Sequence, residues 1–341
     1  MTRYRNIFIL TGQGTQYPGM AQAFYENNPV FRQWMDDLDQ VPRRKLSISV
    51  VDALYESGQP ESIEMINSLD RTAISHPALF MVQYALARTL MDDGILPDCL
   101  FGASLGEYVA LALAEVMPPH EILSALVDNA HILETCCRPG TMIGVSDAVW
   151  RFENEPELNE YTSLAGIISP KQFVLSGSLP GVMRAIRHLE DTGTTFQRLP
   201  IRFGFHSPNI DPAAGVWKKR LAAITARAGG LNRPSIDVIS CCTASFVVRP
   251  EIDFFWEIGR GPILFRRALR TLKEELDRQA EPLSSHSPVA NLIDLGPGSH
   301  SSGFIRQNAV LGKQVRIHRI MTLFNHDMKN LSKLKEKVIL P

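Results

Sequence analysis

The chain has 341 residues, of which 45% are hydrophobic and 21% are charged, and its formal net charge at pH 7 is −1. This length and composition indicate a globular protein with a sizeable buried core, built as one large domain or two smaller ones. The near-neutral charge gives no electrostatic reason to expect a nucleic acid or a membrane surface as partner, and no apolar run approaches the roughly 18–20 residues that span a bilayer.

The first predicted element is a buried strand from Asn6 to Leu10, which leads into the glycine-rich loop "TGQGTQYPGM". Because this apolar run is short and lacks a small-residue cleavage site, it is interpreted as a strand and not as a signal peptide. Apolar residues at helical spacing then predict a helix over 20–41 that is interrupted near Pro29, and a strongly apolar helix over 76–95.

Strands and helices continue to alternate in the rest of the chain. A short strand over 97–104 leads into a helix over 105–117 that is rich in alanine and leucine. Buried strands return at 235–243 and 290–299, and 278–291 is a polar, proline-containing loop. This alternation predicts an α/β fold with a mostly parallel sheet.

The middle of the chain has a different pattern. Between 139 and 204, apolar runs and helical spacing predict the element order β-α-β-β-α-β, which is the split arrangement of ferredoxin-like domains. We therefore expect a small ferredoxin-like domain at 139–204, inserted into a discontinuous large domain made of 1–138 and 205–341.

The five cysteines do not suggest a disulfide framework. Their number is odd, and Cys136 adjoins Cys137 as Cys241 adjoins Cys242, which is neither a disulfide pattern nor the spacing of a metal site. We expect reduced thiols, no metal and a cytoplasmic protein.

The strongest chemical motif surrounds Ser104. Residues 102–106, "GASLG", fit the pattern G-x-S-x-G between a predicted strand and a predicted helix. In that context small neighbours allow a sharp turn that exposes the hydroxyl, and the helix N-terminus directs its free N–H groups toward a developing oxyanion. The pattern favours a nucleophile, with an ordinary helix N-cap as the alternative.

A serine nucleophile needs a base, and the chain has nine histidines. His206, in "RFGFHSPNI", follows the return of the chain from the small domain, where the edge of an interdomain cleft is expected. His300 lies on a second glycine loop and His76 opens the long apolar helix. For each of the three, a surface or helix-capping role is the alternative.

Six motifs, in order, show a resemblance to a known family. They are "GQGTQYPGM", "HPALFMVQYALA", "GASLGEYVALALAE", "FHSP", "FWEIGRGPILFRRAL" and "LIDLGPGSH". The chain resembles, from residue 7 to about 310, the acyltransferase family that includes malonyl-CoA:acyl carrier protein transacylases and the acyltransferases of polyketide synthases. The resemblance implies an α/β-hydrolase-like large domain with a ferredoxin-like insert.

The resemblance also implies roles for individual residues. Ser104 would attack a thioester carbonyl and hold the acyl group as an ester, and His206 would take the serine proton and later activate the acceptor. The family orients this histidine with a main-chain carbonyl, which Gly261 would supply here. The main-chain N–H groups of Gln13 and Leu105 would form the oxyanion hole.

Three positions depart from the family pattern. Ala103 stands where the family usually has His, and His76 stands where it usually has Gln. Malonyl-type members carry an arginine about 25 residues after the serine, which grips the free carboxylate of the acyl group, whereas this chain has Asn129 there, next to Asp128.

The missing arginine argues against malonyl as the acyl group. A neutral Asn beside an Asp cannot stabilise a buried carboxylate, and the loss of such a pair costs about 3–5 kcal/mol when the other partner stays buried. The alternative is that Arg138 or Arg202 reaches the pocket from elsewhere. His76, Asn129 and Phe205 are the expected pocket residues, with Phe205 placed to restrict branching next to the carbonyl.

Three functions are compatible with the resemblance. The first is a trans-acting acyl hydrolase that removes acetyl or stalled acyl groups from acyl carrier proteins. The second is an acyltransferase that loads an acyl unit, taken from CoA or from a carrier protein, onto a carrier protein. The third is a non-catalytic docking protein, against which the intact Ser104 and His206 argue. The protein itself would hold no cofactor, since the substrate carries the phosphopantetheine.

A basic stretch offers a candidate surface for an acidic carrier protein. Its cations are Arg260, Arg266, Arg267 and Arg270. An ordinary solvated helix face is the alternative.

Overall fold

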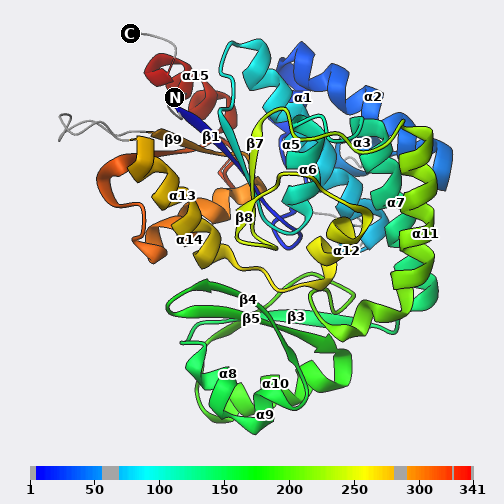
Figure 1. Cartoon of the computed structure of the whole chain (residues 1–341), viewed down its shortest axis with the longest axis vertical. Helices are drawn as coiled ribbons and strands as arrows, with labels where there is room; N and C mark the ends of the chain where they lie inside the picture. The colour runs from blue at the N-terminus through cyan, green and yellow to red at the C-terminus, as the bar shows by residue number, and fades with distance from the viewer. Residues whose placement is uncertain (1–4, 56–68, 280–289, 325, 339–341) are drawn as a thin grey trace.

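The computed structural model describes residues 5–55, 69–279, 290–324 and 326–338. Two sheets organise the molecule (Figure 1). The larger has the order β10-β9-β1-β2-β7-β8, in which all neighbours pair in parallel except β7 and β8. Its strands are β1 (Asn6–Leu10), β2 (Cys99–Gly102), β7 (Asp237–Ser240), β8 (Ser245–Phe246), β9 (Ala290–Asp294) and β10 (Val315–Arg319).

Helices surround this sheet. They are α1 (Gln22–Asn27), α2 (Pro29–Leu46), α3 (Val50–Tyr55), α5 (Thr72–Asp92), α6 (Leu105–Leu113), α7 (Pro119–Cys136), α11 (Ala214–Arg227), α12 (Ile252–Arg260), α13 (Phe265–Gln279), α14 (His300–Asn308) and α15 (Asp327–Val338). Short 3-10 turns cover Pro208–Ala213, Pro297–Ser299 and Gly312–Gln314. None of the helices in the described ranges is long and apolar enough to cross a membrane.

The second sheet is antiparallel and has the order β4-β5-β3-β6. Its elements follow one another as β3 (Gly140–Val145), α8 (Trp150–Asn154), α9 (Pro156–Asn159), β4 (Ser163–Ser169), β5 (Gln172–Ser178), α10 (Leu179–Asp191) and β6 (Phe196–Arg198). Figure 1 shows the three helices on the face of this sheet that is turned away from the large domain. The α/β fold with a small inserted domain is therefore confirmed, whereas the boundaries at 139 and 204 stay a prediction.

Alternation along the strands gives the small sheet two different faces. In β3, Ile143 and Val145 pack under the helices of the small domain, and Met142 points the other way into the core of the large domain. The sheet is also tied to the large domain by main-chain bonds, since the N–H of Ile263 donates to Ala165 O at 2.7 Å and that of Ile167 donates to Ile263 O at 3.1 Å. These contacts pack the inner face of the small sheet against the large domain.

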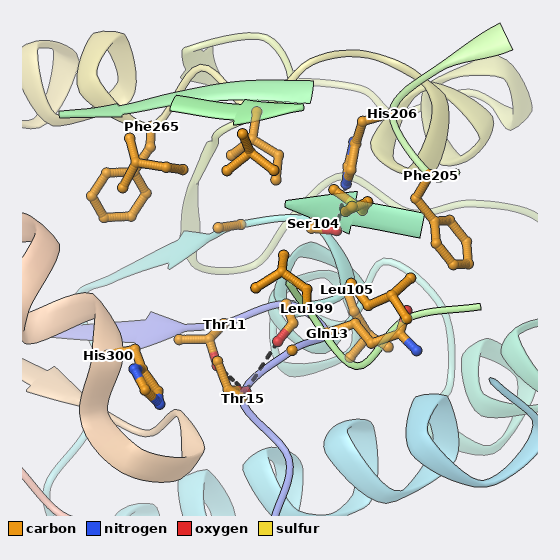
Figure 2. Close-up of a pocket in the computed structure, with 18 of the residues that line it drawn as sticks. Thr11, Gln13, Thr15, Ser104, Leu105, Leu199, Phe205, His206, Phe265 and His300 are labelled. Carbon is orange, nitrogen blue, oxygen red and sulfur yellow. Dashed lines mark hydrogen bonds between the residues drawn. The ribbon is translucent and has the colours of Figure 1, made fainter. Parts of the chain in front are cut away.

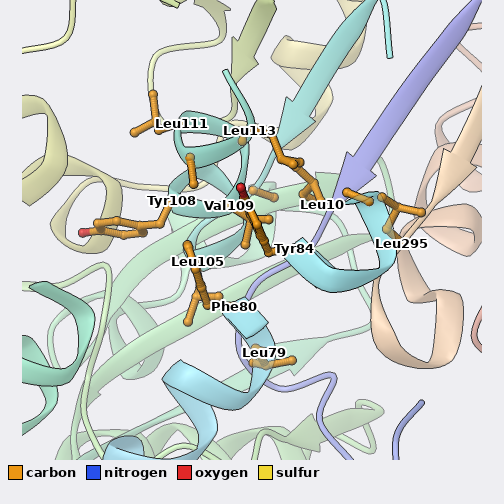
Figure 3. Packing of buried hydrophobic residues seen from close by; sticks show 14 of the residues in the cluster. Leu10, Leu79, Phe80, Tyr84, Leu105, Tyr108, Val109, Leu111, Leu113 and Leu295 are labelled. Carbon is orange, nitrogen blue, oxygen red and sulfur yellow. The ribbon is translucent and has the colours of Figure 1, made fainter. Parts of the chain in front are cut away.

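The core of the large domain lies around β1, α5 and α6 (Figure 3). Leu10 of β1, Phe80 of α5 and Val109 of α6 are fully buried. The predicted strand at Asn6–Leu10 and the break before Pro29 are confirmed. Helix α5 begins at Thr72, four residues earlier than predicted. Of the loop predicted over 278–291, residues 280–289 lie outside the described part.

Candidate active site

Ser104 occupies a strained turn between β2 and α6. Its φ of 51° and ψ of −125° lie outside the common regions for a residue with a side chain, which costs about 1–3 kcal/mol. A Cβ on Gly102 would lie 2.7 Å from Glu107 Cα, and one on Gly106 would lie 2.3 Å from Leu10 O. The two glycines of the motif are thus required by close packing of the turn against its own helix and against β1.

His206 lies beside Ser104 and is held by main chain. Its Nε2 is 2.9 Å from Ser104 Oγ, and its Nδ1 is 2.6 Å from Gly261 O. Since a carbonyl only accepts, Nδ1 carries the proton, and Nε2 accepts from the serine hydroxyl. The N–H of His206 also donates to Gly259 O, so the end of α12 fixes both its backbone and its ring.

The imidazole of His206 is neutral at ordinary pH. Burial lowers its pKa to about 4, although the hydrogen bond to Gly261 opposes this shift. A neutral, oriented imidazole that accepts from a serine hydroxyl can take the proton of that hydroxyl as it attacks a carbonyl.

Gln13 and Leu105 lie next to Ser104 in Figure 2, and both line the same cavity. Leu105 is the first residue of α6, where an N–H has no acceptor within the helix. Within the described residues neither main-chain N–H finds a partner. The side chain of Gln13 is held at both ends, by Ser75 Oγ at 2.9 Å and by His76 Nε2 at 3.1 Å. Both N–H groups are therefore available beside Ser104, and their role as an oxyanion hole stays a prediction of the family resemblance.

The cavity beside Ser104 has a volume of about 220 Å³ and is lined by both domains. Figure 2 shows Ser104 between Phe265 and His300 on one side and Phe205 on the other. No Asp, Glu, Lys or Arg among the described residues lines it. The lining residues that the structure describes offer apolar surface and polar groups, and their only titratable nitrogens are those of histidines.

The three predicted pocket residues, His76, Asn129 and Phe205, all line this cavity. The rings of His76 and Phe205 lie 5.3 Å apart, and burial lowers the pKa of His76 to about 3. His300 also lines the cavity, but the partner of Ser104 is His206.

The structure corrects the placement of Asp128 beside the pocket, and it argues against the alternative arginine clamps. Asp128 does not face the cavity, because its carboxylate binds Lys45 Nζ and Arg220 Nε, each at 2.6 Å. Consecutive helical residues point about 100° apart, so Asn129 faces the cavity while Asp128 faces away. The alternative clamps, Arg138 and Arg202, are exposed and do not line the cavity.

The four arginines proposed to meet a carrier protein do not behave alike. Arg260 forms an ion pair with Asp211, and Arg266 is half-buried. Arg267 and Arg270 are exposed on α13. None of the four lines the cavity, and their contact with a carrier protein stays a prediction.

Sequence reasoning missed the wall that the small domain contributes. Gln172 and Val174 of β5, Met142 of β3 and Gln197 of β6 line the cavity from above. The signal was the period-2 alternation of β5. Gln172 and Val174 point to the face opposite the buried Phe173, which packs under the helices of the small domain.

Glu107 was also missed. It lies in the first turn of α6 and packs against Gly102, two residues before Ser104. It is buried in α6, accepts from Ser240 Oγ and accepts from the N–H of Cys242 at 2.8 Å. Burial raises its pKa to about 8, against the opposing effect of these hydrogen bonds. It therefore joins α6 to β7 as a neutral carboxyl at neutral pH.

This raised pKa predicts a pH-dependent stability. In the folded state Glu107 keeps its proton up to about pH 8, whereas the unfolded chain loses it near pH 4.5. Stability from this group is present below the unfolded pKa and is lost as the pH rises, by up to about 1.4 kcal/mol per pH unit. Urea unfolding of Glu107→Gln should lack this fall between pH 5 and 8. An identical slope in wild type and variant would contradict the assignment.

Comparison with known proteins identifies the family. The acyl transferase domain family matches residues 7–329. BaeD of Bacillus velezensis, a polyketide biosynthesis acyltransferase homolog, is 33% identical over 335 residues, which cover 98% of this chain and 97% of BaeD. PksD of Bacillus subtilis, of the same description, is 32% identical over 326 residues, covering 96% of this chain and 94% of PksD.

A third relative is longer, and solved structures share the fold. The polyketide biosynthesis protein ThaF of Burkholderia thailandensis is 36% identical over 96% of this chain, which spans only 26% of ThaF. The acyl transferase domain of SpnD has a TM-score of 0.83 at 27% identity, covering 99% of this chain and 76% of that one. MCAT from Streptococcus pneumoniae has a TM-score of 0.76 at 22% identity, covering 98% and 100%, which shows the fold alone. The chain therefore belongs to the acyl transferase domain family.

Proposed function

We propose that the protein is a serine acyl hydrolase of polyketide biosynthesis. It removes acetyl or other uncharged acyl groups from the phosphopantetheine of acyl carrier proteins. One observation carries the proposal: no charged side chain among the described residues lines the cavity next to Ser104. The relatives BaeD and PksD support the connection to polyketide biosynthesis by their descriptions.

The chemistry proceeds in two half-reactions. Ser104 Oγ attacks the thioester carbonyl while its proton moves to His206 Nε2, and the Gln13 and Leu105 N–H groups stabilise the oxyanion. Collapse expels the pantetheine sulfur, which takes the proton from His206 and leaves as a thiol. A water molecule then gives a proton to His206 and attacks the ester. Its collapse returns the proton to Ser104 Oγ and releases the free carboxylic acid.

The composition of the cavity supports uncharged acyl groups. A malonyl group would bring a carboxylate into a space where no Lys or Arg in the described part of the chain meets it. Burial of an unpaired carboxylate is far more costly than burial of an acetyl methyl group. Asn129, at the position of the family's arginine, supplies only a neutral amide.

The same neutral polar groups support water as the acceptor. His76 keeps an unprotonated nitrogen at neutral pH, and its Nδ1 is buried without a partner in the described structure. A buried polar atom of this kind is commonly satisfied by an ordered water molecule. Water held in the acyl pocket favours hydrolysis of the acyl-enzyme over transfer of the acyl group to a second carrier protein.

Intact-mass analysis after incubation with acetyl- and malonyl-loaded carrier proteins tests the proposal. We expect an acetyl-enzyme that disappears within seconds to minutes without an acceptor, and slow or no malonylation. Rapid malonyl loading would contradict the pocket argument. A stable acetyl-enzyme that reacts only after a second carrier protein is added would contradict hydrolysis.

Transfer is the second candidate, because BaeD and PksD are both described as acyltransferase homologs. In that function the acceptor is a carrier-protein thiol, and the acyl donor is either a CoA thioester or another carrier protein. A stable acetyl-enzyme in the experiment above would support this candidate.

His206→Ala should slow acylation and deacylation together, because one base serves both half-reactions. The effect of a positioned general base is on the order of 10²–10⁴-fold. In wild type, the acylation rate should be constant above pH 5 and fall below about pH 4, where His206 becomes protonated and can no longer accept the serine proton. Stopped-flow detection of the released thiol measures acylation in its first phase and complete turnover in its steady phase. The control is His131→Ala, at an exposed position of α7. Unchanged acylation in His206→Ala would identify a different base.

A further inference from the structure

A second cavity of about 440 Å³ lies on the large domain, between the end of β10, the loop that follows it and α15. We call it the C-terminal groove. The lining residues that matter here are Gly298, Arg319, Leu323, Phe324, Lys333 and Lys337.

The C-terminal groove is positively charged. Arg319, Lys333 and Lys337 line it together with two histidines, and no Asp or Glu among the described residues does so. Within the same residues, none of the three cations forms an ion pair. His318, in the groove, has its pKa lowered to about 4 by burial and by the nearby Lys337 and Arg316. Arg319 also interacts electrostatically with the buried carboxyl of Asp294 on the neighbouring strand β9. The positive charge of the groove that faces no carboxylate therefore comes from Lys333 and Lys337.

Exposed apolar side chains lie at the mouth of the groove on a loop that is held in place. Leu323 is 62% exposed and Phe324 is 79% exposed. The loop is anchored by Ser299 Oγ, which donates to Met321 O at 2.6 Å, and by the N–H of Thr322, which donates to Asp327 Oδ1 at 3.0 Å. An apolar tip beside unpaired cations is the composition of a protein-docking surface, since it combines charge steering with buried apolar contact.

The groove adjoins the catalytic cavity across a single loop. Gly298 lines the groove, whereas His300 and Ser301, two and three residues later, line the cavity. The ring of His300 lies over Gly298, because a Cβ at that glycine would be 2.8 Å from His300 Nε2. In Figure 2, His300 and Phe205 lie at opposite ends of the cavity. A pantetheine arm that enters past His300 would place its acyl group toward Phe205 and leave its carrier over the groove.

The geometry points to the C-terminal groove as the docking site for the acidic face of the acyl carrier protein. This inference rests on the proposed function, in which the substrate is attached to such a protein. Charge complementarity selects the occupant, because the groove offers Lys333 and Lys337, neither of them in an ion pair within the described residues, to a partner of negative net charge. The site lies on β10 and α15, apart from the arginines of α13 considered above.

Binding is measured first, so that it does not depend on turnover. Ser104→Ala is titrated with an acetyl-loaded, negatively charged carrier domain excised from a polyketide synthase. Adding Lys333→Glu and Lys337→Glu should raise the Kd about tenfold or more and flatten its dependence on salt. Lys329→Glu is the matched control, because Lys329 is exposed on the same helix but does not line the groove.

Turnover then separates docking from chemistry. In the enzyme that keeps Ser104, Lys333→Glu and Lys337→Glu together should raise KM for the acetyl-carrier domain. The same double variant should hydrolyse acetyl-pantetheine at the wild-type rate. An unchanged Kd in the double variant, or an equal loss with Lys329→Glu, would overturn the groove as docking site. Tight binding of CoA alone that is lost in the double variant would also overturn it, in favour of a phosphate site. If neither acetyl-pantetheine nor the acetyl-carrier domain is hydrolysed while groove-dependent binding remains, the proposed function fails and the docking inference stands.

Discussion

Ser104→Ala should abolish both formation of an acyl-enzyme and turnover, while the protein stays folded. The hydroxyl is the atom that lies 2.9 Å from His206 Nε2, and its removal leaves that imidazole without its partner. Removal of a serine nucleophile of this kind typically costs about 10⁴–10⁶-fold in rate. The stability cost should be small, about 1 kcal/mol, because only one hydrogen bond is lost.

The measurement is intact-mass detection of acetylation together with thiol release, with thermal unfolding as the test of the fold. Ser146→Ala, at an exposed position after β3, is the matched control and should behave as wild type. Ser104→Gly adds a second test, since glycine adopts a φ of 51° without strain. It should be inactive but no less stable than Ser104→Ala. Turnover near the wild-type rate in either Ser104 variant would refute the serine nucleophile.

Much of the fold was predictable because its buried strands are continuous apolar runs. Residues 7–10 carry this signal most clearly. At 235–243 the apolar residues are interrupted by Asp237 and Ser240, and the alternation of strands with helices supported the prediction there. β10 was missed because it is an edge strand in which Val315 and Ile317 alternate with charged or polar residues and are only half-buried. β8 has two residues and no pattern of its own.

The site was predictable where chemistry and backbone strain act within a few residues. The turn at Ser104 needs its glycines for local reasons, so the motif alone indicated it. The wall formed by β5 was not predictable, because which face of the small sheet meets the large domain depends on how the two domains dock. The direction of Asp128 was missed for the same reason, since its partners Lys45 and Arg220 are 83 and 92 residues away in the chain.

Asn129→Arg should convert the preference of the cavity from acetyl toward malonyl. The new guanidinium would enter a cavity that has no acidic lining residue in the described structure, and the adjacent Asp128 is already paired with Lys45 and Arg220. Its charge is therefore available to the substrate. A charge-assisted hydrogen bond contributes about 1.5–3 kcal/mol, so malonyl acylation should rise roughly 10–100-fold relative to acetyl.

The same variant should lengthen the life of the acyl-enzyme, because a carboxylate bound to arginine orients the acyl group and excludes water from the pocket. Rates of malonyl and acetyl loading from carrier proteins, and the decay of each ester by intact mass, measure both effects. Asn129→Gln is the control, since it keeps a neutral amide and should leave malonyl loading low. Rapid malonyl loading of wild type, or equal malonyl rates in the Arg and Gln variants, would show that this position does not select the acyl group. A shift in preference without a longer-lived ester would keep Asn129 as the selector and place the control of water elsewhere in the cavity, with His76 as the first residue to test.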